Sequence, residues 1–286
     1  MRHPAVNETI EGWWILHRML AFDRRSFARL PQERRDAIAR EAVDAVRSLQ
    51  NLPQTDAGIA QTIGHKCDLM FTHYARSFDA LAAAQTLLDG CELFDFLQPR
   101  DSYVSILELG LYEATGKIHA ALQERGLKRF SPEWNAAFDE LLQEQAANPR
   151  NAGRLWAGIP QRRYVCFYPM DKKREGSDNW YMLPFEERAR MMLDHGKIGR
   201  TFHGLVTQVI SGSIGYDDYE WGVDLYADDP IVFKKLVYEM RFDEASARFG
   251  AFGPFVSGIQ FSVSELTKYL DGSAVPSLLE LEAAGV

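Results

Sequence analysis

Hydrophobic positions in the first part of the chain change several times between the alternation of a strand and the spacing of a helix. Residues 12–22 (GWWILHRMLAF) form a short aromatic and branched run that predicts a strand. Pro31 begins the predicted helix PQERRDAIAREAVDAVRSL, whose apolar residues recur at Ile38, Ala42, Val46 and Leu49. The next predicted elements are one or two strands in 62–74, a helix over 77–88 that Gly90 ends, and a strand over 103–112.

A similar order of elements returns later in the chain. The predicted elements are a strand over 164–170, a helix over 184–198, strands over 205–211 and 219–226, a helix over 230–240 with Asp229 as N-cap, and a strand over 255–261. A duplicated β-α-β-β-α-β unit is the ferredoxin-like motif, and two such units can join their sheets into one barrel. The pattern therefore predicts an α+β fold, a dimeric α+β barrel made of two ferredoxin-like halves.

Residues 114–160 lack this order. We predict one helix over 135–145, while ANPRNAG (147–153) and AGIPQ (157–161) have the composition of loops. The expected division is an N-terminal half over 1–115, a connecting segment over 116–160, a C-terminal half over 161–262 and a tail over 263–286 with one short helix, SELTKYL.

Composition narrows the class of protein. The 286 residues are 46% hydrophobic and 25% charged, as in soluble globular proteins, and can bury a core without disulfides. Three scattered cysteines, Cys67, Cys91 and Cys166, are too few for a disulfide framework or a zinc site, so we expect them to be buried. A net charge of −8 argues against a nucleic-acid partner. With no signal peptide and no apolar run long enough to span a membrane, we expect a cytoplasmic protein.

His195 ends an apolar helical stripe that begins at Phe185 and includes Ala189 and Met192. One interpretation is a core histidine that bonds to its neighbours. The other is a neutral imidazole that binds iron in an apolar cavity. Met191 and Met192 suit a flat hydrophobic partner as well as an ordinary core, so the stripe alone leaves both interpretations open.

Tyr168, Met170 and Lys172 lie two residues apart, so they share one face of a strand. They could simply form an edge that meets water. In a site, the lysine would supply a cation for a carboxylate, and the tyrosine a phenol that donates a hydrogen bond or loses an electron and a proton. Gln208 shares a face with Val206 and Ile210, where its amide would bond either to the backbone or to a ligand.

Several cations accompany these strands, and they suit either a polyanionic ligand or a solvated surface: Arg154, Arg162, Arg163, Lys173, Arg174, Arg200 and Arg241. The motifs of several common enzyme classes are absent from the sequence. The chain has no phosphate-binding glycine loop, no GxSxG nucleophile elbow and no HExxH zinc motif. We interpret the pair His65 and His73 as structural.

The segments YPMDKKR, NWYMLPFEERARMMLDHGKIGR, GLVTQVISGSIGYDDYEWGVDLYADDP and FKKLVYEMRFDEAS resemble the chlorite dismutase-like haem protein family, in particular its tyrosine-type coproheme decarboxylases. The resemblance runs from EGWWILH to Phe261. It implies two ferredoxin-like halves, a homopentamer, and a porphyrin in the second half.

The resemblance also implies a role for each candidate residue. His195 corresponds to the proximal iron ligand, Tyr168 to a redox-active tyrosine beside one reactive propionate, and Lys172 to the lysine beside the other. Gln208 corresponds to the distal residue, which is an arginine in chlorite dismutases. The remaining matches are Met170 in the pocket and Arg154, Arg200, Arg241 and Ser246 at propionate-binding positions.

The implied activity is the hydrogen peroxide-dependent conversion of two propionates of Fe-coproporphyrin III (coproheme) to vinyl groups, which yields haem b. Coproheme would be both substrate and redox centre, and a coproporphyrin ferrochelatase is an implied partner. The alternatives are a chlorite dismutase or haem peroxidase, a non-enzymatic haem-binding or transfer protein, and a barrel without porphyrin. Two departures stand out: His203 in TFHG, a rival ligand, and a tail after Phe261 that is longer than expected.

Overall fold

The computed structural model describes residues 6–279. Its main sheet has nine strands in the order β10-β5-β11-β2-β3-β1-β4-β8-β9, and β5 also pairs with β9, which closes the sheet into a barrel. All of these pairings are antiparallel. The strands are β1 (Thr9–Phe22), β2 (Thr55–Thr62), β3 (Leu69–Ala75), β4 (Leu97–Gly110), β5 (Tyr164–Lys172), β8 (Thr207–Gly212), β9 (Trp221–Ala227), β10 (Gly250–Phe252) and β11 (Val256–Phe261).

Each half of the barrel has the ferredoxin-like strand order. In the first half the order is β4-β1-β3-β2, and in the second it is β11-β5-β9-β8. The halves join where β11 pairs with β2 and where β4 pairs with β8. The predicted α+β barrel is confirmed, while the division at residues 115, 160 and 262 stays a prediction.

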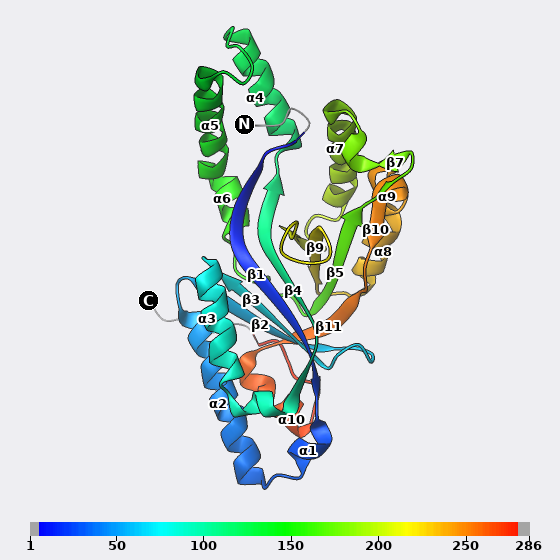
Figure 1. The fold of residues 1–286 in the computed structure, drawn as a ribbon. Helices are drawn as coiled ribbons and strands as arrows, with labels where there is room; N and C mark the ends of the chain where they lie inside the picture. The colour runs from blue at the N-terminus through cyan, green and yellow to red at the C-terminus, as the bar shows by residue number, and fades with distance from the viewer. Residues whose placement is uncertain (1–5, 280–286) are drawn as a thin grey trace.

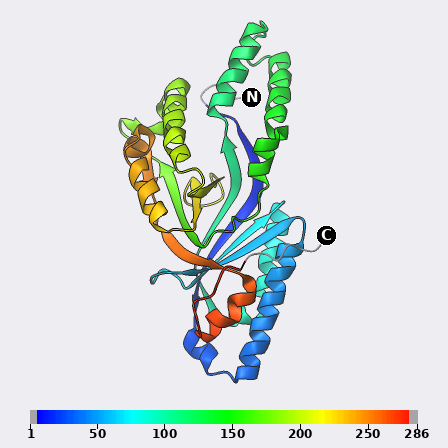
Figure 2. The same cartoon turned by 180° about the vertical axis from the view of Figure 1, so that it is seen from behind.

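The helices of the two halves lie on the outside of the barrel, at different ends of the molecule (Figures 1 and 2). The first half carries α2 (Gln32–Asn51) and α3 (Phe78–Asp89), and the second carries α7 (Phe185–Thr201), α8 (Ile231–Met240) and α9 (Glu244–Phe249). As predicted, Gly90 is the C-cap of α3, and the hydroxyl of Ser77 accepts the N–H of Ala80 at its start. The two halves also contain short helices and a hairpin: α1 (Arg24–Ala28), η1 (Glu92–Phe96), β6 (Arg174–Glu175), β7 (Asp178–Asn179) and η2 (Trp180–Met182).

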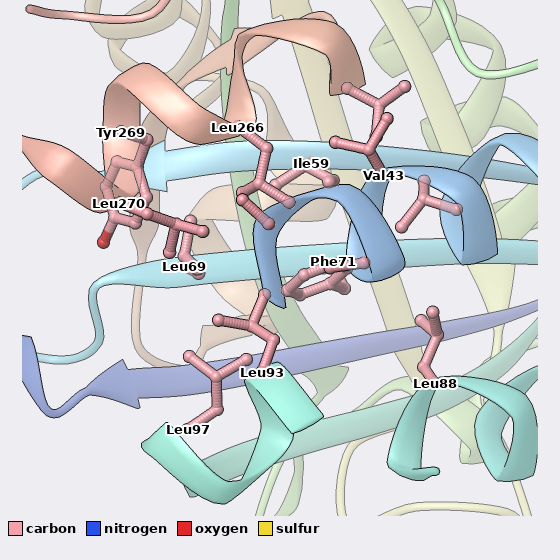
Figure 3. Close-up of a cluster of buried hydrophobic side chains, with 14 of the residues drawn as sticks. Val43, Ile59, Leu69, Phe71, Leu88, Leu93, Leu97, Leu266, Tyr269 and Leu270 are labelled. Carbon is pink, nitrogen blue, oxygen red and sulfur yellow. The ribbon is translucent and has the colours of Figure 1, made fainter. Parts of the chain in front are cut away.

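The core has an outer and an inner part. Outside the barrel, one face of α2 packs on β2 and β3 of the first half, with residues such as Val43, Ile59 and Phe71 in contact (Figure 3). Inside the barrel, a second cluster takes residues from both halves, including Ile15 and Phe167. A buried polar pair also links the halves there, because the Nε2 atom of His17 lies 2.9 Å from Oδ1 of Asp224.

The connecting segment is more helical than predicted. It forms α4 (Tyr112–Glu124), α5 (Pro132–Ala147) and α6 (Pro149–Leu155), so the prediction of loops over 147–153 was wrong. The Asn148 side chain accepts the N–H of Arg150, and Pro149 occupies the first turn, both of which start α6. The α4–α5 hairpin has an apolar cluster of its own, made by Ile118, Leu122, Trp134 and Phe138.

Four smaller predictions need correction. The strand β2 lies upstream of residues 62–74, and residue 112 belongs to α4 rather than to a strand. The short strand β10 was not predicted. The N-cap of α8 is Pro230, although the Asp229 carboxylate does accept the N–H of Ile231.

The tail after β11 belongs to the first half. Its helix α10 (Leu266–Asp271) follows the turn η3 (Val263–Glu265), and it buries Leu266, Tyr269 and Leu270 in the core beneath α2 (Figure 3). Residues 280–286 of the predicted tail lie outside the described residues. The three cysteines are free and buried, as expected. Between residues 6 and 279, no helix is long and apolar enough to cross a bilayer.

Candidate functional site

The outward face of β5 carries the predicted tyrosine, methionine and lysine. Val165 and Phe167 point into the barrel, whereas Cys166 and Tyr168 pack outside it, beneath α8. Tyr168 is 6% exposed, and its ring stacks on Phe255 with centroids 4.4 Å apart. Burial raises the pKa of the Tyr168 phenol, and the neighbouring Cys166 thiol adds to this. The phenol is therefore neutral at physiological pH, and it can lose an electron only together with its proton.

Lys172 lies at the end of this face and is also buried, at 7% exposure. Its Nζ atom donates a hydrogen bond of 3.2 Å to the carbonyl oxygen of Ala245 and lies 4.7 Å from the ring centroid of Trp180. Burial lowers the pKa of Lys172 to about 8, although Asp243 and Glu220 oppose the shift. Its ammonium therefore loses its proton more easily than that of an exposed lysine. A nearby carboxylate would stabilise the charged form.

His195 lies on α7 with its imidazole 27% exposed, and it bonds to a carboxylate. Its Nδ1 atom is 3.0 Å from Oδ2 of Asp243. Burial opposes ionisation of Asp243, but the hydrogen bonds from His195 and Ser246 hold its pKa below the ordinary value. An ionised Asp243 accepts the Nδ1 proton, which leaves the Nε2 lone pair for a metal. This is the arrangement by which carboxylates orient metal-binding histidines.

Ser246 bonds to Asp243 in this structure. Its N–H donates to Oδ1 at 3.0 Å and its hydroxyl to Oδ2 at 2.9 Å, and that hydroxyl is 3.4 Å from Nδ1 of His195. The sequence analysis missed Asp243. The signal that could have found it is the Asp-x-x-Ser pattern in FDEAS, which places an aspartate as N-cap at the start of α9.

The segment from Arg241 to Ser246 brings the two sets of residues together. Arg241 lies over the ring of Phe252, 4.3 Å from its centroid, and Phe252 in turn packs on Tyr168. Asp243 bonds to His195, and the carbonyl of Ala245 bonds to Lys172. The β5 face and the α7 histidine therefore converge on one short stretch of chain.

Gln208 lies on the same outer face of the sheet. Its backbone pairs with Leu225, which pairs with Cys166, so these residues form one row across β8, β9 and β5. The helix α7 comes close to this row at Gly199, where an added Cβ would lie 3.5 Å from the Gln208 amide nitrogen. His195 lies one turn before Gly199 on the same helix. The imidazole is therefore on the part of α7 that passes next to this row.

The other candidates are less closely tied to this cluster. Arg200 is exposed on α7, with its guanidinium beside Gly196, while Arg154 is exposed on α6, which packs on β1 and β4. Met170 is half-buried beside Phe252. Arg162 forms an ion pair with Asp228, as expected of a surface cation. His203 is exposed on the turn that follows α7.

A pocket of about 590 Å³ lies on the far side of Tyr168, between α8 and the strands β5 and β11. Its lining includes Tyr164, Cys166, Phe233 and Phe255, and of the predicted site residues Arg241 takes part. This pocket is therefore a rival location for a flat ligand, separated from Tyr168 by the ring of Phe255.

The donor set suits an iron porphyrin better than a metal held by protein alone. Among residues 6–279, no three His, Cys, Asp or Glu side chains gather to hold an ion. A single histidine with a free Nε2 is sufficient where a porphyrin supplies the in-plane ligands. His195 meets this requirement because Asp243 occupies its other nitrogen.

Comparison with known proteins agrees with this geometry. The family model described as chlorite dismutase matches residues 35–261, which include every candidate site residue. This chain belongs to the chlorite dismutase family. Two curated relatives, from two strains of Thermus thermophilus, are each 40% identical over 284 residues, covering 98% of this chain and 99% of the relative. Both are named coproheme decarboxylase.

Solved structures with the same fold include two that bear on this chain. A haem-binding protein from Thermus thermophilus matches with a TM-score of 0.79 and 39% identity, over 95% of this chain and 100% of that chain. A mutant chlorite dismutase from Candidatus Nitrospira defluvii matches with a TM-score of 0.68 over 91% of this chain and 95% of that one. At 17% identity, this second match bears on the fold alone.

Proposed function

We propose that this protein catalyses the hydrogen peroxide-dependent oxidative decarboxylation of two propionates of Fe-coproporphyrin III to vinyl groups, which yields haem b. The observation that carries the proposal is the convergence on residues 241–246 of a buried neutral phenol, a buried lysine and a histidine with a free Nε2. The two Thermus relatives named coproheme decarboxylase support the same substrate.

Each residue then has a task in binding or orienting coproheme. His195 offers Nε2 to the iron, and Asp243 fixes the tautomer with Nδ1 protonated. Lys172 offers its ammonium to one propionate, and Arg154, Arg200 and Arg241 offer theirs to others. Met170 and Gln208 contact the ring from the sheet. Ser246, expected from the sequence to bind a propionate, acts here through Asp243.

Tyr168 transfers an oxidising equivalent to the propionate. Coproheme and peroxide together supply the oxidising power when both are bound. The phenol of Tyr168 is neutral and shielded from water, so it passes on an oxidising equivalent by losing its electron and proton together. It then removes a hydrogen atom from the propionate side chain. The side chain would give its second electron to the remaining oxidising equivalent that peroxide supplies, so that carbon dioxide leaves and a vinyl group remains. The second round repeats this on the three-propionate product.

Gln208 disfavours the alternative of chlorite decomposition. An arginine occupies the corresponding position of chlorite dismutases, where its charge assists the reaction of an oxyanion, and an amide cannot supply that charge. From the family resemblance we also propose a homopentamer in the cytoplasm that receives coproheme from a coproporphyrin ferrochelatase.

The test is to add ferric coproporphyrin III and hydrogen peroxide and to follow the mass of the porphyrin. We expect two successive losses, each of carbon dioxide and two hydrogen atoms. Tyr168→Phe should bind coproheme as the wild type does but lower the conversion by on the order of a thousandfold. Tyr164→Phe, on the same strand face, is the matched control and should convert normally. A Tyr168→Phe protein that still makes haem b would contradict the proposal, as would oxygen release from chlorite with no change in porphyrin mass.

A further inference from the structure

Glu108 belongs to the first half, but its side chain reaches into the second. It lies on the outward face of β4, which joins β8 through the pairs Ile106–Gly212 and Leu107–Ser211. Its carboxylate lies directly over Gly212, where any side chain would clash with it. Because Gly212 has no side chain, the carboxylate from the first half can lie over β8 and reach Trp221 on β9.

The carboxylate is held at the edge of the proposed coproheme face. Oε1 of Glu108 accepts a hydrogen bond of 2.9 Å from the indole Nε1 of Trp221. Trp221 pairs with Met170 on one side and with Gly212 on the other. Trp221, Met170 and Gly212 form one row on the outer face, and the adjacent row contains Tyr168, Val223 and Ile210. Glu108 therefore lies on the outer face that also carries Tyr168, with β8 and β9 between their strands, and the Trp221 indole reaches it from β9.

Glu108 also has a route to solvent. It lines a pocket of about 270 Å³ with Glu11, Ile106, Gly212, Ile214 and Tyr216. The titratable groups that face it are Glu11 on β1, Tyr112 at the start of α4 and Tyr216 on the turn before β9, while Trp221 on β9 donates to it. Burial raises the pKa of Glu108 and the charge of Glu11 adds to this, whereas the Trp221 bond opposes it.

The proposed reaction needs such a proton. One round converts a propionate, one hydrogen peroxide and one proton into a vinyl group, one carbon dioxide and two water molecules. The side chain loses two electrons, and peroxide accepts them as its O–O bond breaks. Gln208 has no titratable proton to give. Lys172 is buried, its ammonium donates to the carbonyl oxygen of Ala245, and in the proposed function it pairs with a propionate, so it is occupied in binding.

We propose that Glu108 is the proton relay of this site: its carboxyl gives up the proton that each decarboxylation consumes, and water in the 270 Å³ pocket returns it. The inference rests on the proposed function. It adds a residue from the first half to a site whose other residues come from the connecting segment and the second half.

The first experiment measures conversion of coproheme at limiting peroxide as a function of pH. Glu108→Gln keeps the shape and the acceptor for Trp221 but has no proton to give. It should bind coproheme normally and, at saturating coproheme, convert it about a hundredfold more slowly at neutral pH, without the alkaline loss of rate that we expect of the wild type. Glu11→Gln is the matched control from the same pocket. Removing its charge lowers the pKa of Glu108, so the alkaline loss should move to lower pH with the maximal rate unchanged.

The second experiment needs no substrate. The emission of Trp221, obtained as the difference between wild type and Trp221→Phe, should change with pH as Glu108 titrates. That change should lie above the ordinary glutamate value of about 4.3 and be absent in Glu108→Gln. If the wild type makes haem b and Glu108→Gln converts coproheme at the same rate at every pH, the role of Glu108 is overturned while the proposed function stands. A Trp221 emission change that titrates near the ordinary glutamate value would have the same consequence. A wild type that makes no haem b would overturn the proposed function itself.

Discussion

The two halves of the barrel share one strand order but use their first helix differently. In the first half, α2 buries a full apolar stripe against the sheet: Ile38, Ala39, Ala42, Val43, Val46 and Leu49. In the second half, α7 buries only Arg188 and Met191, and its main contacts are with α4, α8 and α9 rather than with strands. The same arrangement of strands and helices therefore buries a core in the first half and forms the candidate site in the second. In the second half, the helix α7 carries His195 where α2 carries a stripe of buried apolar residues.

This difference separates stability from function in the molecule. The α2 stripe removes apolar surface from water and should contribute directly to the free energy of folding. The α7 face contributes little packing, so its residues are free to serve a ligand. Changes in the α2 stripe should therefore alter stability without altering binding, and changes at His195 on α7 should mainly alter binding.

The largest expected effect comes from His195→Ala. Without the imidazole, the iron of bound coproheme loses its protein ligand. Turnover should fall by on the order of a thousandfold, and the absorption spectrum of the ferric complex should shift. The unfolding free energy should fall by no more than about 2 kcal/mol, the value of a hydrogen bond to a charged group. An unchanged iron spectrum would count against the assignment. His203→Ala, on the exposed turn after α7, is the matched control.

A graded version of the same test replaces the carboxylate behind the histidine. Asp243→Asn keeps the shape but removes the charge that orients the imidazole. Loss of such a partner typically weakens a metal site by about 10- to 100-fold, so this variant should lie between wild type and His195→Ala.

The second prediction concerns the first half. Ile38→Ala removes a fully buried side chain from the α2 core. The unfolding free energy, measured with urea, should fall by about 2–5 kcal/mol, while the affinity of the folded protein for coproheme stays the same. Leu193→Ala on α7, where the side chain is 45% exposed, should cost about 0.5 kcal/mol or less. Equal losses in the two variants would show that the two helices do not differ as described.

The smallest effect is a pH dependence at Lys172. Its ammonium attracts a propionate below a pKa of about 8 and loses that charge as the pH rises through this value. Coproheme affinity should therefore weaken roughly tenfold on the alkaline side. The apo protein should show the opposite sign, because a lysine whose folded pKa is depressed destabilises the fold while it is protonated. Its stability should rise between pH 8 and the ordinary lysine value.

Lys172→Arg separates this charge from other titrations. The guanidinium stays charged across the whole range, so the alkaline loss of affinity should disappear. An alkaline loss that persists in Lys172→Arg would place the titrating group elsewhere.

The sequence predicts the barrel because the spacing of its hydrophobic residues changes between that of a strand and that of a helix at most element boundaries. It does not predict β2, where TDAGIAQT is rich in small residues and lacks the branched run typical of a strand. The helices of the connecting segment were also difficult to predict. The apolar residues of α4 and α5, such as Leu122 and Phe138, pack on each other rather than on the sheet.

The site was predictable only as far as local spacing and resemblance reach. The shared face of Tyr168, Met170 and Lys172 follows from the two-residue period of a strand. The bond from His195 to Asp243 joins residues 48 apart, and the bond from Trp221 to Glu108 joins residues 113 apart, so no local pattern encodes either. The roles of Arg154 and Arg200 stay predictions, because both are exposed on helices.

The most direct measurement locates the iron. Crystals of the protein with ferric coproporphyrin III, measured at the iron absorption edge, would give one anomalous peak per bound substrate. We predict that the peak lies at bonding distance from Nε2 of His195, with the ring between α7 and the face that carries Gln208 and Met170. A peak in the 590 Å³ pocket beside Phe233, with His195 unbound, would contradict the account.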